Sequence, residues 1–236
     1  MSVVNIFLEY WPQLLQGLWM TIQLSLLVTL VGLALGLVAA LGRASRVWIF
    51  RTIASLYVET IRGVPPLLLL FAIYFTLPEH GITLSSFVSA VIALGLYAGS
   101  FTCEIFRAGI GAVPRGQLEA GRSLGLTKWQ LNVKVVFPQA FRMMIPPLAN
   151  QIIMNIKGTS LAVTITVPEL MFVAYTGASN TFRAGDFYLI AAIFYLALII
   201  PLGQISKRLE GSRFTRSAKL LTTTTTSNKV RRMKVH

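Results

Sequence analysis

Five apolar runs, each about 20–25 residues long, constrain the fold of this chain more than any other feature. They are expected at residues 18–41, 53–77, 84–106, 143–167 and 187–205. A helix of that length measures about 30–37 Å, enough to cross a hydrocarbon core of about 30 Å. A soluble core cannot hold such runs in 236 residues that are 55% hydrophobic and only 12% charged. The runs are continuous rather than alternating, so the sequence predicts an all-α polytopic membrane protein with five transmembrane helices.

The basic residues predict the orientation of these helices. If the N-terminus is outside, 18 of the 21 Lys and Arg residues lie on the inner side, and Arg183 alone lies on the outer side. The other two, Arg62 and Lys157, fall within spans. The opposite orientation would invert the positive-inside rule at every loop. We therefore expect the N-terminus outside and the C-terminus in the cytoplasm.

This orientation divides the chain into segments. Residues 18–210 form the membrane domain, with residues 1–17 as a periplasmic N-terminal segment. Residues 211–236 are a basic tail, expected to be disordered and held near anionic lipid. The net charge of +13 does not indicate nucleic-acid binding, because the basic residues adjoin apolar spans and few aromatic residues interleave with them.

The longest connection is the basic inner loop 108–142, between the third and fourth spans. Residues 117–124 are predicted to form a short helix with Gly125 as its C′ residue. Residues 127–130 match a capping box that opens a second helix, and Pro138 is expected to end or kink it. This loop carries its own structure.

A motif within the loop suggests a docking surface. Ala120 and Gly121 are small enough to let another backbone approach, and Glu119 offers a carboxylate to a basic partner. Apolar residues alternate with basic ones along the rest of the loop. A helical hairpin that rests on lipid headgroups is the alternative interpretation.

Charged residues in the second span predict a polar site inside the membrane. Glu59 and Arg62 are three residues apart, so they share a helical face and are able to pair. A charge at mid-bilayer costs at least about 2.5–3.5 kcal/mol on insertion scales, so such residues usually have a function. Gly63 follows directly, and Pro65 and Pro66 remove two amide donors, which predicts a broken helix. Broken helices form substrate sites in transporters.

The fourth span has a similar polar stripe. Asn150, Lys157, Ser160 and Thr164 recur on one helical face, and Lys157 lies about 21 Å from the inner end. Its ammonium could meet a substrate carboxylate, balance Glu59 in an ion network that staples the bundle, or snorkel to the interface. Thr159 and Ser160 could instead bond back to carbonyls of their own helix.

Several classes of protein are excluded or disfavoured by absent motifs. The chain has no P-loop, no H-E-x-x-H and no G-x-S-x-G, so it is not expected to bind ATP or to be an enzyme. A single cysteine, Cys103, excludes an internal disulfide, and two histidines make a metal site improbable. Five spans do not divide into equal inverted halves, which argues against a self-contained secondary transporter. Five helices line a pathway thinly, so we expect a dimer.

The inner loop resembles the EAA loop of ABC-transporter membrane subunits. The similarity rests on Glu119-Ala120-Gly121, then Gly125, then an apolar run to Pro138, with Gly121 where a second alanine is usual. Segments 57–65, 104–110 and 157–161 are similar to the polar amino-acid branch, which includes histidine, glutamine, arginine and opine permeases. Val64 and Gly158 stand where that branch commonly has Thr and Asp.

The resemblance implies a function and a set of partners. The chain would be the permease subunit of an ABC importer for polar amino acids or opines in the bacterial inner membrane. ATP and Mg would bind a separate cytoplasmic ATPase that docks on the loop, here a coupling helix. A second permease subunit, identical or homologous, and a periplasmic solute-binding protein would complete the system. The alternatives from the residues alone are an ATP-independent channel or facilitator and, more remotely, an intramembrane enzyme.

Overall fold

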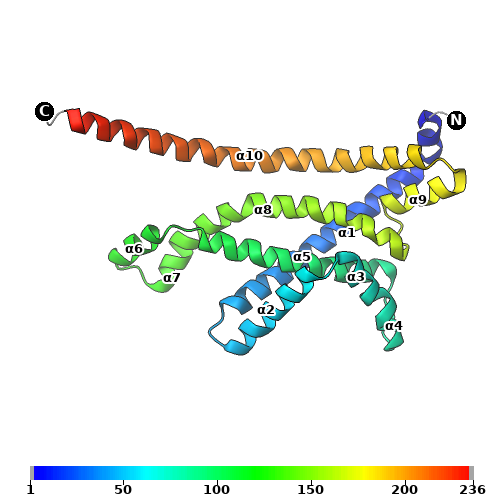
Figure 1. Cartoon of the computed structure of the whole chain (residues 1–236), viewed down its shortest axis with the longest axis horizontal. Helices are drawn as coiled ribbons and strands as arrows, with labels where there is room; N and C mark the ends of the chain where they lie inside the picture. The colour runs from blue at the N-terminus through cyan, green and yellow to red at the C-terminus, as the bar shows by residue number, and fades with distance from the viewer. Residues whose placement is uncertain (1–2, 234–236) are drawn as a thin grey trace.

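The structure is a computed structural model that describes the backbone of residues 3–233 and the side chains of residues 3 and 5–208. Every secondary-structure element in this range is helical, which confirms the predicted all-α class (Figure 1). The α-helices are α1 (Val3–Ala44), α2 (Trp48–Gly63), α3 (Pro66–Phe71), α4 (Leu77–Glu79), α5 (Ser86–Gly111), α6 (Arg115–Ser123), α7 (Lys128–Leu131), α8 (Phe137–Gly158), α9 (Leu170–Thr181) and α10 (Ala184–Met233). Short π or 3-10 helices link some of them: η1 (Ala72–Thr76), η2 (Asn132–Val136) and η3 (Thr159–Ile165).

Three helices are long and apolar enough to cross a membrane unaided: α1, α5 and the first half of α10. Two further spans arise if each bent pair counts as one crossing. One pair is Trp48–Gly63 with Pro66–Glu79, bent by 108°, and the other is Lys128–Ile165 with Leu170–Thr181, bent by 46°. The total then equals the five expected spans.

Small residues bring α1 and α5 into close contact. A Cβ atom added at Gly32 would meet Ala98, and one added at Gly36 would meet Thr102. Both glycines therefore let the two backbones approach, as small residues do at helix interfaces in membranes. Four residues forward on α1, from Gly32 to Gly36, correspond to four residues forward on α5, from Ala98 to Thr102. The two helices therefore run in the same direction.

The other long helices alternate in direction around this pair. The α8 helix runs against α5, because the late Gly109 of α5 packs on the early Met144 of α8, whereas the earlier Leu94 lines one pocket with the later Lys157. The α10 helix in turn runs against α8, where Ser206 donates to Asn150 at 3.4 Å. The described backbone begins at Val3 and ends at Met233, and these two points lie at opposite ends of the long axis (Figure 1).

The second span is broken where the prolines predict. The α2 helix ends at Gly63, Val64 is extended, and Pro65 stands before the first turn of α3. The amides of Leu68 and Leu69 both bond the carbonyl of Pro65, so the hydrogen-bond ladder restarts there. In Figure 1, α3 and α4 turn away from α2.

Pro138 neither ends nor sharply interrupts its helix, contrary to the expectation. The backbone widens into the π-helical η2 directly before it and continues as α8, where Pro138 occupies the first turn. A proline needs no amide partner in a first turn, so the widened turn absorbs its missing donor and its ring. The helical run that contains the fourth apolar segment therefore extends from Lys128 to Ile165, and Thr166 directly after it has a φ of 61°.

The tail also differs from its expected state. The α10 helix continues to Met233, so the backbone is helical through most of segment 211–236, for which disorder was expected. Extending an existing helix adds a hydrogen bond for each residue that is fixed, which is far easier than starting one. Residues 234–236 lie outside the described range.

Candidate functional site

The inner loop folds into two helices joined by a tight turn at Gly125. The α6 helix ends in a pair of bonds, from the amide of Gly125 to the carbonyl of Arg122 at 2.9 Å and from Leu126 to Gly121 at 3.1 Å. This is the Schellman arrangement, and the φ of +74° at Gly125 is the left-handed conformation that it requires. The predicted C′ role of Gly125 is confirmed.

The capping box at the start of α7 is also present. The backbone amide of Gln130 donates to the hydroxyl of Thr127 at 3.3 Å, and the side-chain oxygen of Gln130 accepts from the backbone amide of Thr127 at 3.0 Å. These reciprocal bonds set the angle at which α7 leaves the turn.

Gly121 lies at the contact between α6 and α7. It is buried, and a Cβ atom there would collide with Leu131 of α7. Its small size therefore lets α6 and α7 pack closely within this chain. Ala120 and Glu119, one and two residues before it, are exposed and remain available to a partner.

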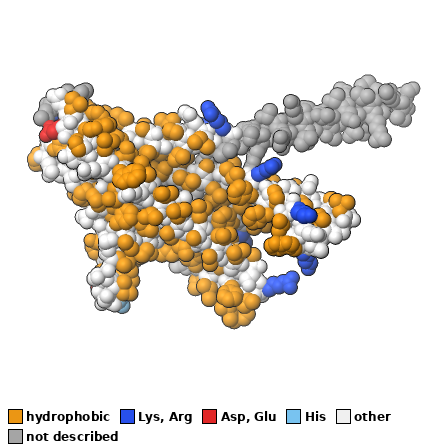
Figure 2. Space-filling view, turned by 180° about the vertical axis from the view of Figure 1, so that it is seen from behind, with side chains coloured by type: hydrophobic (Ala, Val, Ile, Leu, Met, Phe, Trp, Pro, Cys, Tyr) orange, Lys and Arg blue, Asp and Glu red, His pale blue; other side chains and the backbone are white. Residues whose placement is uncertain are grey.

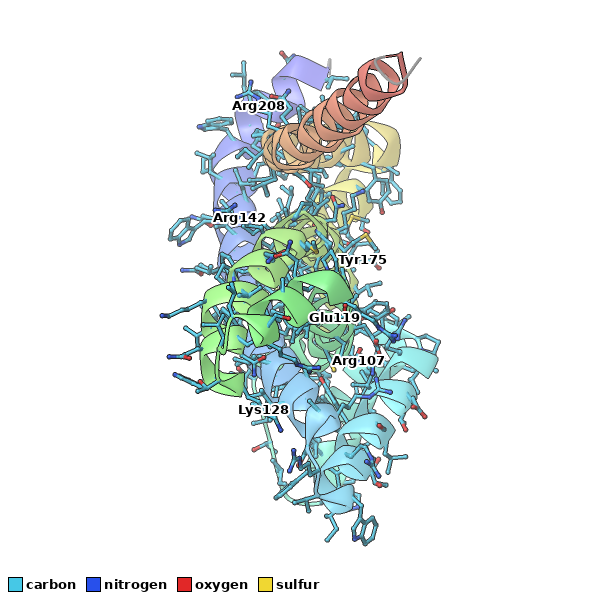
Figure 3. All side chains as sticks on the ribbon, turned by 90° about the vertical axis from the view of Figure 1, so that its left-hand side faces the viewer. Arg107, Glu119, Lys128, Arg142, Tyr175 and Arg208 are labelled. Atoms are coloured by element: carbon cyan, nitrogen blue, oxygen red, sulfur yellow. The ribbon has the colours of Figure 1, made fainter. Side chains whose placement is uncertain are left out.

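The outer surface of this hairpin is both apolar and basic. Leu124 is 81% exposed and Trp129 is 75% exposed. Arg115, Arg122 and Lys128 are exposed between them. Figure 3 looks at the molecule from the end that carries the hairpin and places Glu119 and Lys128 on it. In Figure 2, Lys and Arg side chains gather on the half of the visible face toward this end, beside a mostly hydrophobic centre.

A cluster of ion pairs joins three helices near the same end of the bundle. Glu104 of α5 is its centre, because Arg43 of α1 donates to it and Arg107 lies 3.3 Å from it. Arg62 of α2 lies 3.7 Å from Glu104, and Glu59 pairs with Arg43 at 3.3 Å. We call these five residues the Glu104 cluster. Glu104 and Arg107 are three residues apart on α5, so this pair forms along one helical face.

The expected direct pairing of Glu59 with Arg62 is not what the structure shows. Each residue instead pairs across helices, with Arg43 and Glu104 respectively. Arg43 was missing from the candidate residues because it follows the first span and looks like an ordinary interfacial arginine. Arg43 reaches the carboxylates of Glu59 and Glu104 only because α1 packs beside α2 and α5.

Lys157 does not join this cluster. No acidic partner lies within ion-pair distance of it among the described residues, so the proposed balance with Glu59 is absent. Lys157 instead lines a pocket of about 420 Å³ between α5 and the end of α8. Ser160 and Gly158 line the same pocket, and Pro66 lines it directly after the break in the second span.

The other residues of the predicted polar stripe on the fourth span do not face one common site. Thr159 is fully buried and bonds the carbonyl of Ile156 at 2.7 Å, while Ser160 bonds that of Lys157 at 2.7 Å. Both hydroxyls thus bond back to their own helix, as the alternative anticipated. Asn150 faces α10 through Ser206 and does not line the pocket with Lys157.

A buried carboxylate in the opposite half of the bundle was not anticipated. Glu169 is 0% exposed and caps α9 by accepting from the amide of Phe172 at 2.8 Å. It also accepts from the hydroxyl of Tyr195 at 2.8 Å, and Thr21 lies 3.5 Å away. Glu169 thereby links α1, α9 and α10. The sequence signal was a carboxylate just after Pro168, a suitable N-cap, but its burial depends on the packing.

Comparison with known proteins places this architecture in a family. A model described as "Binding-protein-dependent transport system inner membrane component" matches residues 32–215. The chain is similar to the L-cystine transport system permease protein TcyB of Bacillus subtilis, with 42% identity over 86% of this chain and 87% of the relative. It is also similar to the glutamine transport system permease protein GlnP of Escherichia coli, with 36% identity over 84% and 92% of the two chains.

Solved structures agree with the sequence comparison. A chain from a crystal structure titled as an amino acid ABC transporter with histidines matches with a TM-score of 0.85 and 32% identity, over 90% of this chain and 99% of that one. A chain of the inward-facing MetNI methionine ABC transporter matches with a TM-score of 0.67 at 20% identity, over 89% and 97%, and so shares the fold. The chain therefore belongs to the inner-membrane components of binding-protein-dependent transport systems, as an ABC-importer permease subunit that works with separate ATPase subunits and a substrate-binding protein.

Proposed function

We propose that this permease subunit carries polar amino acids, or related opines, across the inner membrane. The observation that carries the substrate class is the pocket around Lys157, which has no carboxylate among its lining residues. An ammonium, the amides of Gln151 and Asn155 and the hydroxyl of Ser160 suit a small zwitterion whose carboxylate meets Lys157. The relatives named for cystine and glutamine transport support this class.

The same proposal assigns the hairpin of α6 and α7 as the coupling surface. The exposed residues Glu119 and Ala120 would contact the ATPase, while Gly121, Gly125 and Pro138 hold the backbone that presents them. The hairpin directly continues into α8 through η2, so movement of the docked ATPase would reach the fourth span as a rigid-body shift. Glu59, Arg62, Gly63 and Pro65 would border the path from the second span.

The assembly is also part of the proposal. A second permease subunit, identical or homologous, would close the path, and the solute-binding protein would deliver substrate at the end that bears the N-terminus. The N-terminus would be periplasmic, and the hairpin and tail cytoplasmic near anionic lipid, because this orientation follows the positive-inside rule.

Charge reversal at Glu119 tests the coupling assignment. In vesicles that contain the full transporter, Glu119→Lys is expected to abolish ATP-driven uptake while the variant inserts normally and reaches wild-type abundance. Glu79→Lys, at an exposed carboxylate of α4, is the matched control and should transport normally. Normal uptake by Glu119→Lys would reject the coupling assignment. Uptake without any ATPase subunit would instead favour an independent facilitator.

The substrate class is tested with the cognate solute-binding protein and with Lys157. Amino acids and opines that raise the melting temperature of the binding protein are then supplied as labelled substrates to the reconstituted transporter. Lys157→Met is expected to lower uptake at least tenfold through loss of the carboxylate contact. Uptake that is unchanged in Lys157→Met would remove Lys157 from the substrate site.

A further inference from the structure

Two chambers lie along the groove between α5 and α8. The first, which we call the Lys157 chamber, measures about 420 Å³. The second, called here the inner chamber, measures about 520 Å³ and includes Glu104 and Ala108 in its lining. Because α5 and α8 are antiparallel, the chambers follow one another along both helices rather than lying side by side.

Phe101 of α5 and Gln151 of α8 are the residues that line both chambers. Along α5, Tyr97 lies in the Lys157 chamber and Ile105 in the inner chamber, on either side of Phe101. Along α8, Lys157 lies in the first chamber and Pro147 in the second, on either side of Gln151. The boundary between the chambers therefore falls at the same level on both helices.

The ring of Phe101 is held by a residue of the second span. The guanidinium of Arg62 lies 5.0 Å from the centre of the Phe101 ring, within the range of a cation–π contact. Arg62 also belongs to the Glu104 cluster and directly precedes the break at Gly63. The ring of Phe101 is thus connected to the hinge of the second span.

Gln151 is held through a chain of hydrogen bonds. Its side chain donates to Asn155 at 2.9 Å, and Asn155 donates to the hydroxyl of Thr29 on α1 at 3.0 Å. These bonds fix the amide at the boundary and connect it to the first span. Both boundary residues therefore sit where movement between spans would displace them.

We propose that Phe101 and Gln151 form an internal gate in the translocation path, with Arg62 and Asn155 as positioning residues. The inference rests on the proposed function, in which substrate passes the Lys157 chamber and a second subunit covers the groove. A zwitterion must move the ring and the amide aside to reach the inner chamber. A change in the bend of the second span would shift Arg62 and release the ring, which couples the gate to the rigid-body motion.

Thiol labelling measures the gate directly. The starting variant is Cys103→Ala, which removes the only cysteine, a fully buried one. Ser160→Cys then reports on the Lys157 chamber and Ala108→Cys on the inner chamber. A charged, membrane-impermeant thiol reagent is added from the hairpin side of vesicles that contain the whole transporter without ATP. Ala108→Cys should react quickly and Ser160→Cys slowly.

Removal of the gate is expected to speed the slow reaction. Adding Phe101→Ala and Gln151→Ala should raise the labelling rate of Ser160→Cys at least tenfold and leave that of Ala108→Cys unchanged. Met154→Ala, which shortens a side chain that lines only the Lys157 chamber, is the matched control and should not change the rate. Equal rates for Ser160→Cys with and without the gate side chains would overturn the proposal. If the double variant fails to assemble, Phe101→Leu decides, with a smaller increase expected.

The positioning role of Arg62 has its own readout. Arg62→Gln should raise the Ser160→Cys rate several-fold, and Arg62→Lys, which keeps a cation near the ring, should restore most of the slow reaction. An unchanged Ser160→Cys labelling rate in Arg62→Gln would show that Arg62 and the Glu104 cluster do not position the gate. These rates do not depend on which substrate is carried, so a wrong substrate class would leave the gate result standing.

Discussion

Single residues decide the geometry of this molecule at Gly125 and Glu169. The left-handed φ of Gly125 turns the chain between α6 and α7. Glu169 accepts hydrogen bonds both from the start of α9 and from the hydroxyl of the partly buried Tyr195. The need for glycine could be predicted from local signals, since a C′ glycine follows a short helix pattern. The burial of Glu169 could not, because Tyr195 and Thr21, which meet its carboxylate from other helices, lie 26 and 148 residues away along the chain.

Gly125→Ala tests the turn. A Cβ atom in the left-handed region costs about 1–2 kcal/mol, so the hairpin should shift or loosen. We expect lower uptake and weaker ATPase stimulation by the binding protein, at normal membrane abundance. Gly111→Ala is the control, because Gly111 has open space around it and no positive φ. Equal effects of the two substitutions would argue against a special role for the turn.

Glu169→Leu tests the buried carboxylate. The change leaves the Phe172 amide and the Tyr195 hydroxyl without their acceptor, and each unsatisfied group costs about 1–3 kcal/mol. The melting temperature of the purified subunit in detergent should fall clearly, and Glu169→Gln, which keeps one acceptor oxygen, should lower it less. Glu79→Leu, at an exposed carboxylate, should leave it nearly unchanged. A harmless Glu169→Leu would mean that other groups or water satisfy both donors.

At the scale of elements, the Glu104 cluster ties α1, α2 and α5 together. Its arginines differ in environment, since the side chain of Arg43 is 14% exposed and that of Arg107 is 53% exposed. Attraction between charges is stronger where water is excluded, but so is the penalty for an unpaired charge. The contribution of each arginine should therefore follow its burial.

Arg43→Gln is expected to destabilise the bundle more than Arg107→Gln. Breaking a buried pair costs about 3–5 kcal/mol, whereas an exposed pair contributes about 0–1 kcal/mol. Arg43 also pairs with two carboxylates at once. Thermal unfolding of both variants in the same detergent measures the difference. The reverse order would show that solvent reaches Arg43 in the assembled transporter.

Element boundaries could be predicted where a local rule acts alone. The capping box at Thr127 and the break before Pro66 are short-range effects of side chain and ring. Pro138 looked similar, yet the helix passes it, because a widened turn and packing of the following span compensate for the lost amide. A proline in the sequence shows that a backbone hydrogen bond of the helix is lost. The packing around the proline then determines whether the helix breaks or widens into a π-helical turn.

At the scale of the whole molecule, helix direction alternates from span to span. The parallel contact of α1 with α5 and the antiparallel contact of α5 with α8 are consistent with an odd number of crossings. The chain ends then lie on opposite sides of the membrane. Which side is cytoplasmic rests on the distribution of basic residues.

Reporter fusions test the orientation. A reporter that folds only outside the cytoplasm should be active before Met1 and inactive after His236, and a cytoplasmic reporter should give the opposite result. A fusion of either reporter at Thr83, between α4 and α5, is the internal control and should behave as the N-terminal fusion does. Identical activity at both ends would contradict five crossings.

Local sequence patterns are enough to predict the all-α membrane class, the number of apolar spans, the break at Pro65 and the caps of the hairpin. These features depend on residues that are close along the chain, so composition and short-range hydrogen bonding suffice. Helix packing instead sets three other relations: Arg43 joins Glu104, Gly121 packs on Leu131, and Phe101 and Gln151 face one boundary. Those relations join different helices, and helices choose neighbours by the fit of whole faces, which no short segment encodes.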